Sequence, residues 1–318
     1  MGRIVTLLAV KKSIYQINVE QMKLSIVTIN YNNAEGLRKT LASVASQTYH
    51  DIEHIIIDGG STDGSVDVIR EYESLNRSSI HPLTITWVSE RDNGIYHAMN
   101  KGIKRSSGEY VFILNSGDAL ASDDVVERMV GVLKELENEG VRELEKRVPI
   151  LMGNIVHVYG EGRKEKERKR AKMNALIPRP VDASMLTFYR GTIPQDAAFV
   201  RRDLFKKYGY FDETMKICAD WKLYLDMIAL GGVVPMYVDI DVVIFDMSGV
   251  SNTNNERRLA ERRAYLEKVL PAAVLKDYDA YAFLIHQYQR LKKHHLWGFV
   301  RFLERVLFKL EKWGILNV

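Results

Sequence analysis

The feature that most constrains the fold is an alternation of short apolar runs with amphipathic segments between residues 22 and 114. The apolar runs are bounded by turn residues and are too short for ordinary helices, so we expect them to be buried strands. The segments between them carry apolar residues at helical spacing. Strands are expected at 22–30, 52–57, 85–88 and 110–114, and helices at 34–47, 66–75 and 95–105. This alternation predicts a mostly parallel α/β sheet, flanked by helices, with right-handed crossovers.

The rest of the chain is expected to complete this domain and then to change character. Residues 125–144 have the pattern of a helix with a polar face, and residues 150–159 have that of a strand. A further helix is expected to begin close to Asp220. Towards its end the chain becomes basic and mostly helical in pattern. We therefore divide it into an N-terminal extension, 1–21, an α/β domain, 22–250, and a basic helical C-terminal segment, 251–318.

The composition of this 318-residue chain limits the kinds of protein that it can be. Cys218 is the only cysteine, which excludes an internal disulfide and a cysteine metal cluster and fits a reducing cytoplasm. No stretch approaches the roughly 20 apolar residues that span a bilayer. The net charge is +4, with basic residues gathered at 163–172 and near the C-terminus. Because the run at 163–172 has no interleaved aromatic residues, we expect no nucleic-acid binding.

Acidic and amide side chains follow the predicted strands. Asp58 ends the second strand, Asp92 follows the third, and Asn115 and Asp118 follow the fourth. In an open α/β sheet, ligands bind beyond the carboxyl ends of the strands, so Asp92 and Asp118 should border one crevice. Two carboxylates there suit a divalent cation that carries a diphosphate, since hard cations take oxygen ligands. Taken singly, Asp58 or Asp118 could equally cap a turn or a helix.

These segments, in this order, resemble those of family 2 glycosyltransferases, a group with the GT-A fold that builds bacterial surface polysaccharides. The resemblance covers about residues 22–230 and includes a late aspartate at a helix start. The matching segments are 24–33, 55–65, 89–102 and 110–118. The resemblance implies an inverting transfer of a sugar from a nucleotide-sugar donor, expected to be a UDP-sugar, to a hydroxyl of a glycan or lipid-linked glycan.

The resemblance also implies roles for residues at the nucleotide end of the site. Thr28 and Asn30, at the end of the first strand, would line the nucleotide pocket. Asp58 would recognise the base, because a carboxylate can accept the imide N–H of uracil. Asp92 would lie beside the nucleotide and the donor sugar. These four residues are the expected nucleotide-binding set, together with Asn115 and Asp118.

The metal and the catalytic base are implied in the same way. Asn115-Ser116-Gly117-Asp118 stands in place of the family's aspartate-rich motif, with only Asp118 left to hold Mg²⁺ or Mn²⁺ against the diphosphate. Asn115 would add an amide oxygen. Asp220 resembles the family's catalytic base, which deprotonates the acceptor hydroxyl as it attacks the anomeric carbon.

Two other kinds of protein share parts of the pattern. A nucleotidyltransferase also uses a parallel sheet and an acidic metal site, but residues 30–33 offer no basic, glycine-rich phosphate loop. A metal motif with only one aspartate left would fit a non-catalytic scaffold that binds a nucleotide sugar. Asp220 at a helix start favours an enzyme instead.

The C-terminal segment allows two interpretations. Residues 296–310 combine aromatic side chains with cations, a pattern shared by a helix that packs on its own domain and by an interfacial membrane helix. The second would place a cytoplasmic protein at the anionic inner face of the cell membrane. We take that location as a hypothesis.

Overall fold

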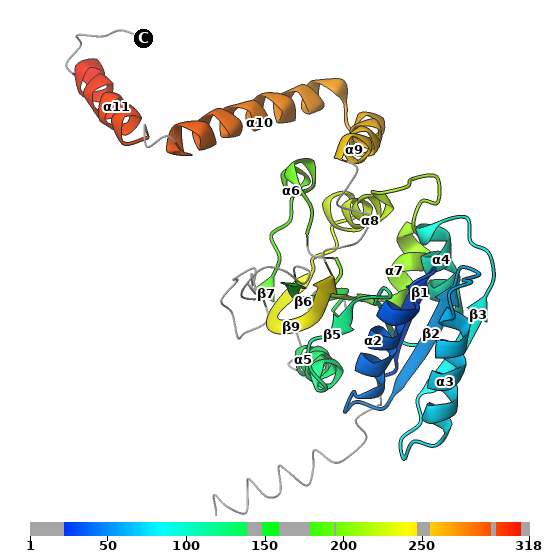
Figure 1. Ribbon diagram of the computed structural model, residues 1–318. Helices are drawn as coiled ribbons and strands as arrows, with labels where there is room; N and C mark the ends of the chain where they lie inside the picture. Colours follow the sequence, from blue (N-terminus) through cyan, green and yellow to red (C-terminus); the bar gives the residue numbers. More distant parts are fainter. Residues whose placement is uncertain are drawn as a thin grey trace, which may run out of the picture.

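The computed structural model describes residues 22–138, 148–158, 179–193, 195–246, 255–293 and 297–312. The predicted N-terminal extension and the basic run at 163–172 lie outside these residues. The described residues form one mixed sheet with helices on both faces (Figure 1).

The first half of the sheet is parallel and contains the first four predicted strands. The strands are, in spatial order, β3 (Thr84–Ser89), β2 (Ile52–Asp58), β1 (Leu24–Asn30) and β4 (Tyr110–Ile113). Their crossover helices are α2 (Ala34–Ala45), α3 (Ser65–Arg77) and α4 (Ile95–Arg105). Because neighbouring strands run the same way, the carboxyl ends of all of these strands meet at one edge.

The second half of the sheet adds antiparallel pairings. Strand β8 (Ala198–Arg201) is antiparallel to β4 and to β6 (Ile150–Val158), and β9 (Met236–Asp246) runs parallel to β6. Two short strands, β5 (Ala119–Leu120) and β7 (Arg179–Pro180), pair antiparallel with β9. The predicted mostly parallel sheet is confirmed. The antiparallel strands that complete it had no clear signal in the sequence, since β5 and β7 have only two residues each.

The remaining helices cover the second half of the sheet and form the C-terminal extension. They are α5 (Val125–Asn138), α6 (Met185–Arg190), α7 (Arg202–Tyr208), α8 (Ala219–Tyr224), α9 (Asn255–Val269), α10 (Ala272–Lys293) and α11 (Trp297–Lys312). Helix α8 continues directly as a π-helix over Leu225–Leu230. Figure 1 shows α10 and α11 extending away from the sheet. No helix in the described part of the chain is both long and apolar enough to cross a membrane.

Strand β1 shows how the two faces of the sheet are covered. Leu24 and Ile26 belong to a core shared with α5, whereas Val27 and Ile29 belong to a core shared with α4 and α8. Alternate side chains of a strand point to opposite faces, which accounts for this division. Helix α4 approaches β1 very closely, because a Cβ built on Gly102 would lie 2.2 Å from Cγ1 of Val27. Glycine therefore lets α4 pack directly on the central strand.

Candidate functional site

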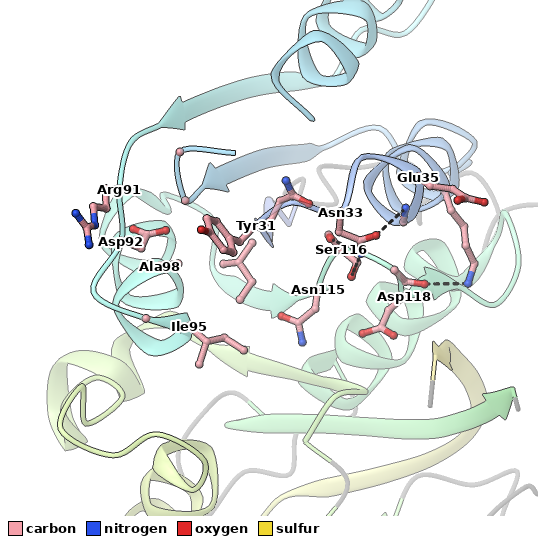
Figure 2. Close-up of a pocket in the computed structure, with 18 of the residues that line it drawn as sticks. Tyr31, Asn33, Glu35, Arg91, Asp92, Ile95, Ala98, Asn115, Ser116 and Asp118 are labelled. Carbon is pink, nitrogen blue, oxygen red and sulfur yellow. Dashed lines mark hydrogen bonds between the residues drawn. The ribbon is translucent and has the colours of Figure 1, made fainter. Parts of the chain in front are cut away.

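An open cleft of about 1190 Å³ lies where β1, β2, β3 and β4 end (Figure 2). Four of the predicted site residues line it, and they come from the ends of three strands: Asn30, Asp92, Asn115 and Asp118. The cleft thus occupies the position that the strand pattern predicts. Thr28, Asp58 and Asp220 do not line it.

Asp58 lies beneath the floor of the cleft and is fully buried. Its Oδ1 accepts hydrogen bonds from Nδ2 of Asn30 (2.8 Å) and Oγ of Ser61 (2.6 Å). Its Oδ2 accepts from the amide of Ser61 (2.9 Å) and Oγ of Ser89 (2.6 Å). Burial would raise the pKa of Asp58, but the bonds from Ser61, Ser89 and Asn30 outweigh burial and lower it. The carboxylate therefore stays ionised and ties together the ends of β1, β2 and β3.

Asn30 is 5% exposed and lines the cleft directly above Asp58. Its Nδ2 must face Asp58, because an ionised carboxylate only accepts hydrogen bonds. Its Oδ1 is buried and has no hydrogen-bond partner among the described residues. A buried acceptor without a partner costs stability. Asn30 is therefore prepared to accept a hydrogen bond from a ligand.

Thr28 does not reach the cleft, contrary to the expectation from sequence. Its side chain is fully buried, and its Oγ1 lies 2.9 Å from Nε2 of His54. Nδ1 of His54 in turn lies 2.9 Å from the hydroxyl of Tyr72. Burial lowers the pKa of His54 to about 3, so this ring is neutral. Strand alternation places Thr28 and Asn30 on one face, but Thr28 lies one pleat further from the edge.

Asp92 is held by a lysine of α4. Nζ of Lys101 lies 2.7 Å from Oδ1 of Asp92 and 2.8 Å from Oε1 of Glu90. Burial alone would lower the pKa of Lys101, but its bonds to these two carboxylates outweigh burial and raise it. A Cβ on Gly59 would lie 3.2 Å from Oδ2 of Asp92. The glycine thus lets the end of β2 approach this carboxylate closely, and Lys101 fixes its orientation.

The turn that follows β4 is held by α2. Lys39 donates from Nζ to the carbonyl of Gly117 (2.9 Å), and Thr40 donates from Oγ1 to the carbonyl of Asp118 (2.6 Å). Gly117 has a φ of +107°, which favours glycine at this position of the turn. Figure 2 shows Asn115 and Asp118 side by side on this turn.

The residues of this turn fit a divalent cation only in part. Oδ1 of Asn115 is buried and has no partner among the described residues, and the Asp118 side chain is 6% exposed. An amide oxygen and a carboxylate are ligands that Mg²⁺ and Mn²⁺ accept. Within the described ranges, however, no group of three or more His, Cys, Asp or Glu side chains could hold a metal. The diphosphate of a bound donor would have to supply further ligands.

Asp220 is the second residue of α8 and does not line the cleft. The hydroxyl of Tyr96, on α4, lies 2.6 Å from the carbonyl of Ile217 and 3.2 Å from Oδ1 of Asp220. Burial raises the pKa of Asp220. Burial and, to a smaller extent, the charge of Asp220 raise the pKa of Asp196 to about 6. Two carboxylates therefore share one region with raised pKa values, as is common where a base must accept a proton near neutral pH.

Trp221, next to Asp220, is a core residue. It is 1% exposed, and its Nε1 donates to the carbonyls of Phe188 (3.0 Å) and Gly191 (3.1 Å). The indole therefore fixes α8 against the segment that contains α6.

Sequence reasoning missed several residues of the cleft. Tyr31 lines it with 68% of its surface exposed, and Lys39 and Arg91 bring cations to it. Tyr31 could have been found from its place directly after β1. Lys101 carried no such signal, because eight residues of turn and helix separate it from Asp92.

Comparison with known proteins identifies the family. The model for "Glycosyl transferase family 2" matches residues 25–209. Glycosyltransferase Rv1514c of Mycobacterium tuberculosis is 31% identical over 204 residues, which cover 63% of this chain and 67% of the relative. The PGL/p-HBAD biosynthesis glycosyltransferase Rv2957 of Mycobacterium tuberculosis is 27% identical over 241 residues, covering 75% and 82%.

Solved structures show the same fold at lower sequence identity. TarS 1-349 of S. aureus superimposes with a TM-score of 0.52 at 18% identity, covering 71% of this chain and 60% of that one. GalNAc-T7, solved with UDP, GalNAc and Mn²⁺, gives a TM-score of 0.55 at 14% identity, covering 79% and 48%. These likenesses confirm the GT-A-like fold. Together with the family match, they show that this chain is a glycosyltransferase of family 2.

Proposed function

We propose that this protein is an inverting glycosyltransferase that moves a sugar from a UDP-sugar to a hydroxyl of a glycan or lipid-linked glycan in surface-polysaccharide synthesis. The observation that carries the proposal is the arrangement along one edge of the sheet. Asn30 offers the cleft an amide oxygen without a partner among the described residues, Asn115 and Asp118 offer oxygens on the turn after β4, and Asp220 is bonded to Tyr96 of α4. TarS, which has the same fold, has also been solved with UDP-GlcNAc.

The uracil would bind near Tyr31 and Asn30. The exposed ring of Tyr31 provides a surface on which a base can stack. Oδ1 of Asn30 would accept the imide N–H of uracil. Both oxygens of Asp58 already accept two hydrogen bonds each, so Asp58 would contribute to base recognition by orienting Asn30. Asp92 would then lie beside the ribose and the donor sugar.

The diphosphate would lie against the turn after β4. Asp118 and Oδ1 of Asn115 would hold Mg²⁺ or Mn²⁺ there, and a bound cation would offset the charge of the departing diphosphate. Nζ of Lys39, fixed beside the carbonyl of Gly117, adds a positive charge from the protein itself. A cation of this kind would offset part of the diphosphate charge alongside the metal.

Asp220 would act as the general base. Its carboxylate takes the proton of the acceptor hydroxyl while the acceptor oxygen forms a bond to the anomeric carbon. The bond from that carbon to the diphosphate breaks, and its electron pair leaves with UDP. Attack opposite to the leaving group inverts the configuration, so the base and the diphosphate must lie on opposite sides of the sugar. Tyr96 orients Asp220 from the α4 side.

Calorimetric titration with UDP and GDP, with and without Mn²⁺, tests the donor site. We expect metal-dependent UDP binding that Asp118→Ala abolishes, and the Asp220→Asn variant should bind UDP like wild type. UDP release from a panel of UDP-sugars should fall about 10²–10⁴-fold in Asp220→Asn, the usual contribution of a general base. A folded wild-type protein that binds no nucleotide would refute the proposal and favour a scaffold.

We further propose that α11 lies on the anionic inner face of the membrane. Its apolar side chains are exposed: Phe299, Phe302, Leu303, Val306, Leu307 and Phe308. Arg301 and Arg305 lie beside this apolar surface, as in helices that bind anionic lipid. Figure 1 shows α11 away from the sheet, where it could lie on a bilayer while the cleft remains open.

Sedimentation with lipid vesicles tests this contact. The protein should sediment with vesicles that contain phosphatidylglycerol and much less with phosphatidylcholine alone. Phe302→Asp should abolish sedimentation, whereas Glu304→Gln, which changes the polar face of the same helix, should not. Equal behaviour of wild type and Phe302→Asp would contradict the proposal.

A further inference from the structure

Helix α9 is hydrogen-bonded to the segment at 216–218, which leads into the proposed catalytic base. Glu261 accepts three backbone hydrogen bonds from this segment: from the amides of Lys216 (2.9 Å), Ile217 (3.0 Å) and Cys218 (3.0 Å). These amides directly precede α8, whose second residue is Asp220. Cys218, the residue before α8, makes no side-chain capping bond, and the backbone that enters α8 is instead held by a carboxylate from another helix.

The bonds to Glu261 are charge-assisted and sheltered from solvent. The Glu261 side chain is 15% exposed. Burial would raise its pKa, but the amides of Lys216, Ile217 and Cys218 outweigh burial and lower it, so the carboxylate stays ionised. Hydrogen bonds to an ionised group are roughly twice as strong as bonds between neutral groups. The segment at 216–218 is therefore firmly held.

Other contacts join α9 to the region of α8, next to the hydrogen bonds of Glu261. The Arg262 guanidinium lies over the Trp221 ring, 5.1 Å from its centroid, and Nη1 of Arg262 donates to the carbonyl of Gly191 (3.1 Å). Tyr265 donates to the carboxylate of Asp226, and Leu266 is buried in the core that also contains Trp221. Helix α9 is thus packed on the base side of the site, whereas the cleft is lined by other elements.

The segment at 216–218 is held from its opposite side by α4. The Tyr96 hydroxyl bonds to the carbonyl of Ile217, and Glu261 bonds to the amide of the same residue. The backbone before Asp220 is therefore fixed between two helices. Removal of either contact leaves the backbone of Ile217 with one of these two bonds.

We infer that Glu261 is a positioning residue that holds Asp220 at the distance from the donor sugar needed for proton abstraction. This inference rests on the proposed role of Asp220 as the base. It assigns a catalytic purpose to α9, the first helix of the C-terminal segment, that is separate from any membrane contact of α11. Misplacement of a reacting group by about 1 Å can cost on the order of 10²-fold in rate.

The test compares Glu261→Gln and Glu261→Ala with Glu267→Gln in the full-length chain. Glu267 is the matched control, because it lies on the same helix but is exposed, and its ion pair within the described ranges is with Arg263. In the Glu261 variants, kcat for UDP release from UDP-glucose or UDP-GlcNAc should fall about 10–100-fold. UDP affinity should stay within about twofold of wild type, because the nucleotide site lies on other elements. Glu267→Gln should match wild type in both.

Amide hydrogen exchange gives a readout that does not require turnover. The amides of 216–218 should exchange faster in Glu261→Gln, with exchange in β1 and β2 unchanged. Fast exchange with an unchanged kcat would overturn the positioning role, as would an equal loss of kcat and UDP affinity, which indicates general unfolding. A wild-type protein that turns over no UDP-sugar refutes the proposed function itself, and the exchange data then still decide whether Glu261 holds the segment.

Discussion

The contact between α4 and β1 yields a sharp prediction, because one methyl group tests it. In Gly102→Ala, the new Cβ would lie 2.2 Å from Cγ1 of Val27, far inside an ordinary contact. Val27 cannot turn away, since it is β-branched, fully buried and part of the central strand. Helix and strand would therefore have to move apart by roughly 1 Å.

The expected magnitude follows from two opposing effects. Overpacking a well-filled core costs about 1–3 kcal/mol, whereas replacing glycine by alanine inside a helix gains up to about 1 kcal/mol. Gly102→Ala should therefore lower the free energy of unfolding by about 1–2 kcal/mol, or the Tm by about 2–8 °C for a domain of this size. Gly131→Ala is the matched control, because its Cβ would meet nothing within 4 Å in α5. That variant should gain about 0.5–1 kcal/mol.

Urea unfolding of the two variants and wild type provides the assay. If the clash with Val27 is the cause, Val27→Ala/Gly102→Ala should lose less stability than the sum of the two single variants. A Gly102→Ala protein as stable as Gly131→Ala would refute the close approach of α4 to β1. Because α4 also carries Tyr96 and Lys101, the same variant should lower kcat.

Three further predictions concern charged groups. Lys101→Met should weaken UDP-sugar binding in calorimetry by about tenfold, because Asp92 loses the lysine that orients it beside the ribose and the donor sugar, and Lys101→Arg should retain most of it. The pKa of Glu53 is lowered to about 2, so its ionised carboxylate should contribute stability that is full above about pH 4.5 and disappears towards pH 2. If Glu53→Gln lowers the free energy of urea unfolding by the same amount at every pH, this prediction is contradicted. The charge of Asp220 raises the pKa of Asp196, and the coupling of two carboxylates is mutual. Asp196→Asn should therefore move the acid limb of the kcat/KM profile to lower pH, and an unmoved limb would show that the two carboxylates are independent.

Local pattern was sufficient to predict the parallel half of the sheet. The expected helix at 95–105 agrees with α4, Ile95–Arg105, because Gly94 breaks the chain before it and Ser106 takes an extended backbone after it. The expected helix at 125–144 is observed as far as Asn138, where the described residues stop. Strand ends then placed Asn30, Asp92, Asn115 and Asp118 at one edge, since parallel pairing brings carboxyl ends together whatever the loops do.

What the sequence did not reveal depends on contacts between distant residues. Glu261 lies more than 40 residues from the amides that it binds, and its neighbours give no sign of those partners. Asp58 was expected to face the ligand, but the bonds that occupy it come from three separate strand ends. Residue type predicts that a carboxylate at a strand end will be bonded, whereas only the fold decides whether the partner is protein or ligand.

Helix α4 connects the two halves of the proposed reaction. On one side, Lys101 orients Asp92 at the donor cleft. On the other, Tyr96 bonds to Asp220, and Asn100 exchanges hydrogen bonds with the backbone of Phe211 ahead of α8. One helix carries all of these contacts, and its Gly102 lets it pack directly against Val27 of β1. The distance between the donor cleft and the base therefore cannot change without moving the central strand. We therefore expect the base and the donor cleft to keep one fixed separation, and substrate-dependent movement to arise in the acceptor-side segments rather than in α4.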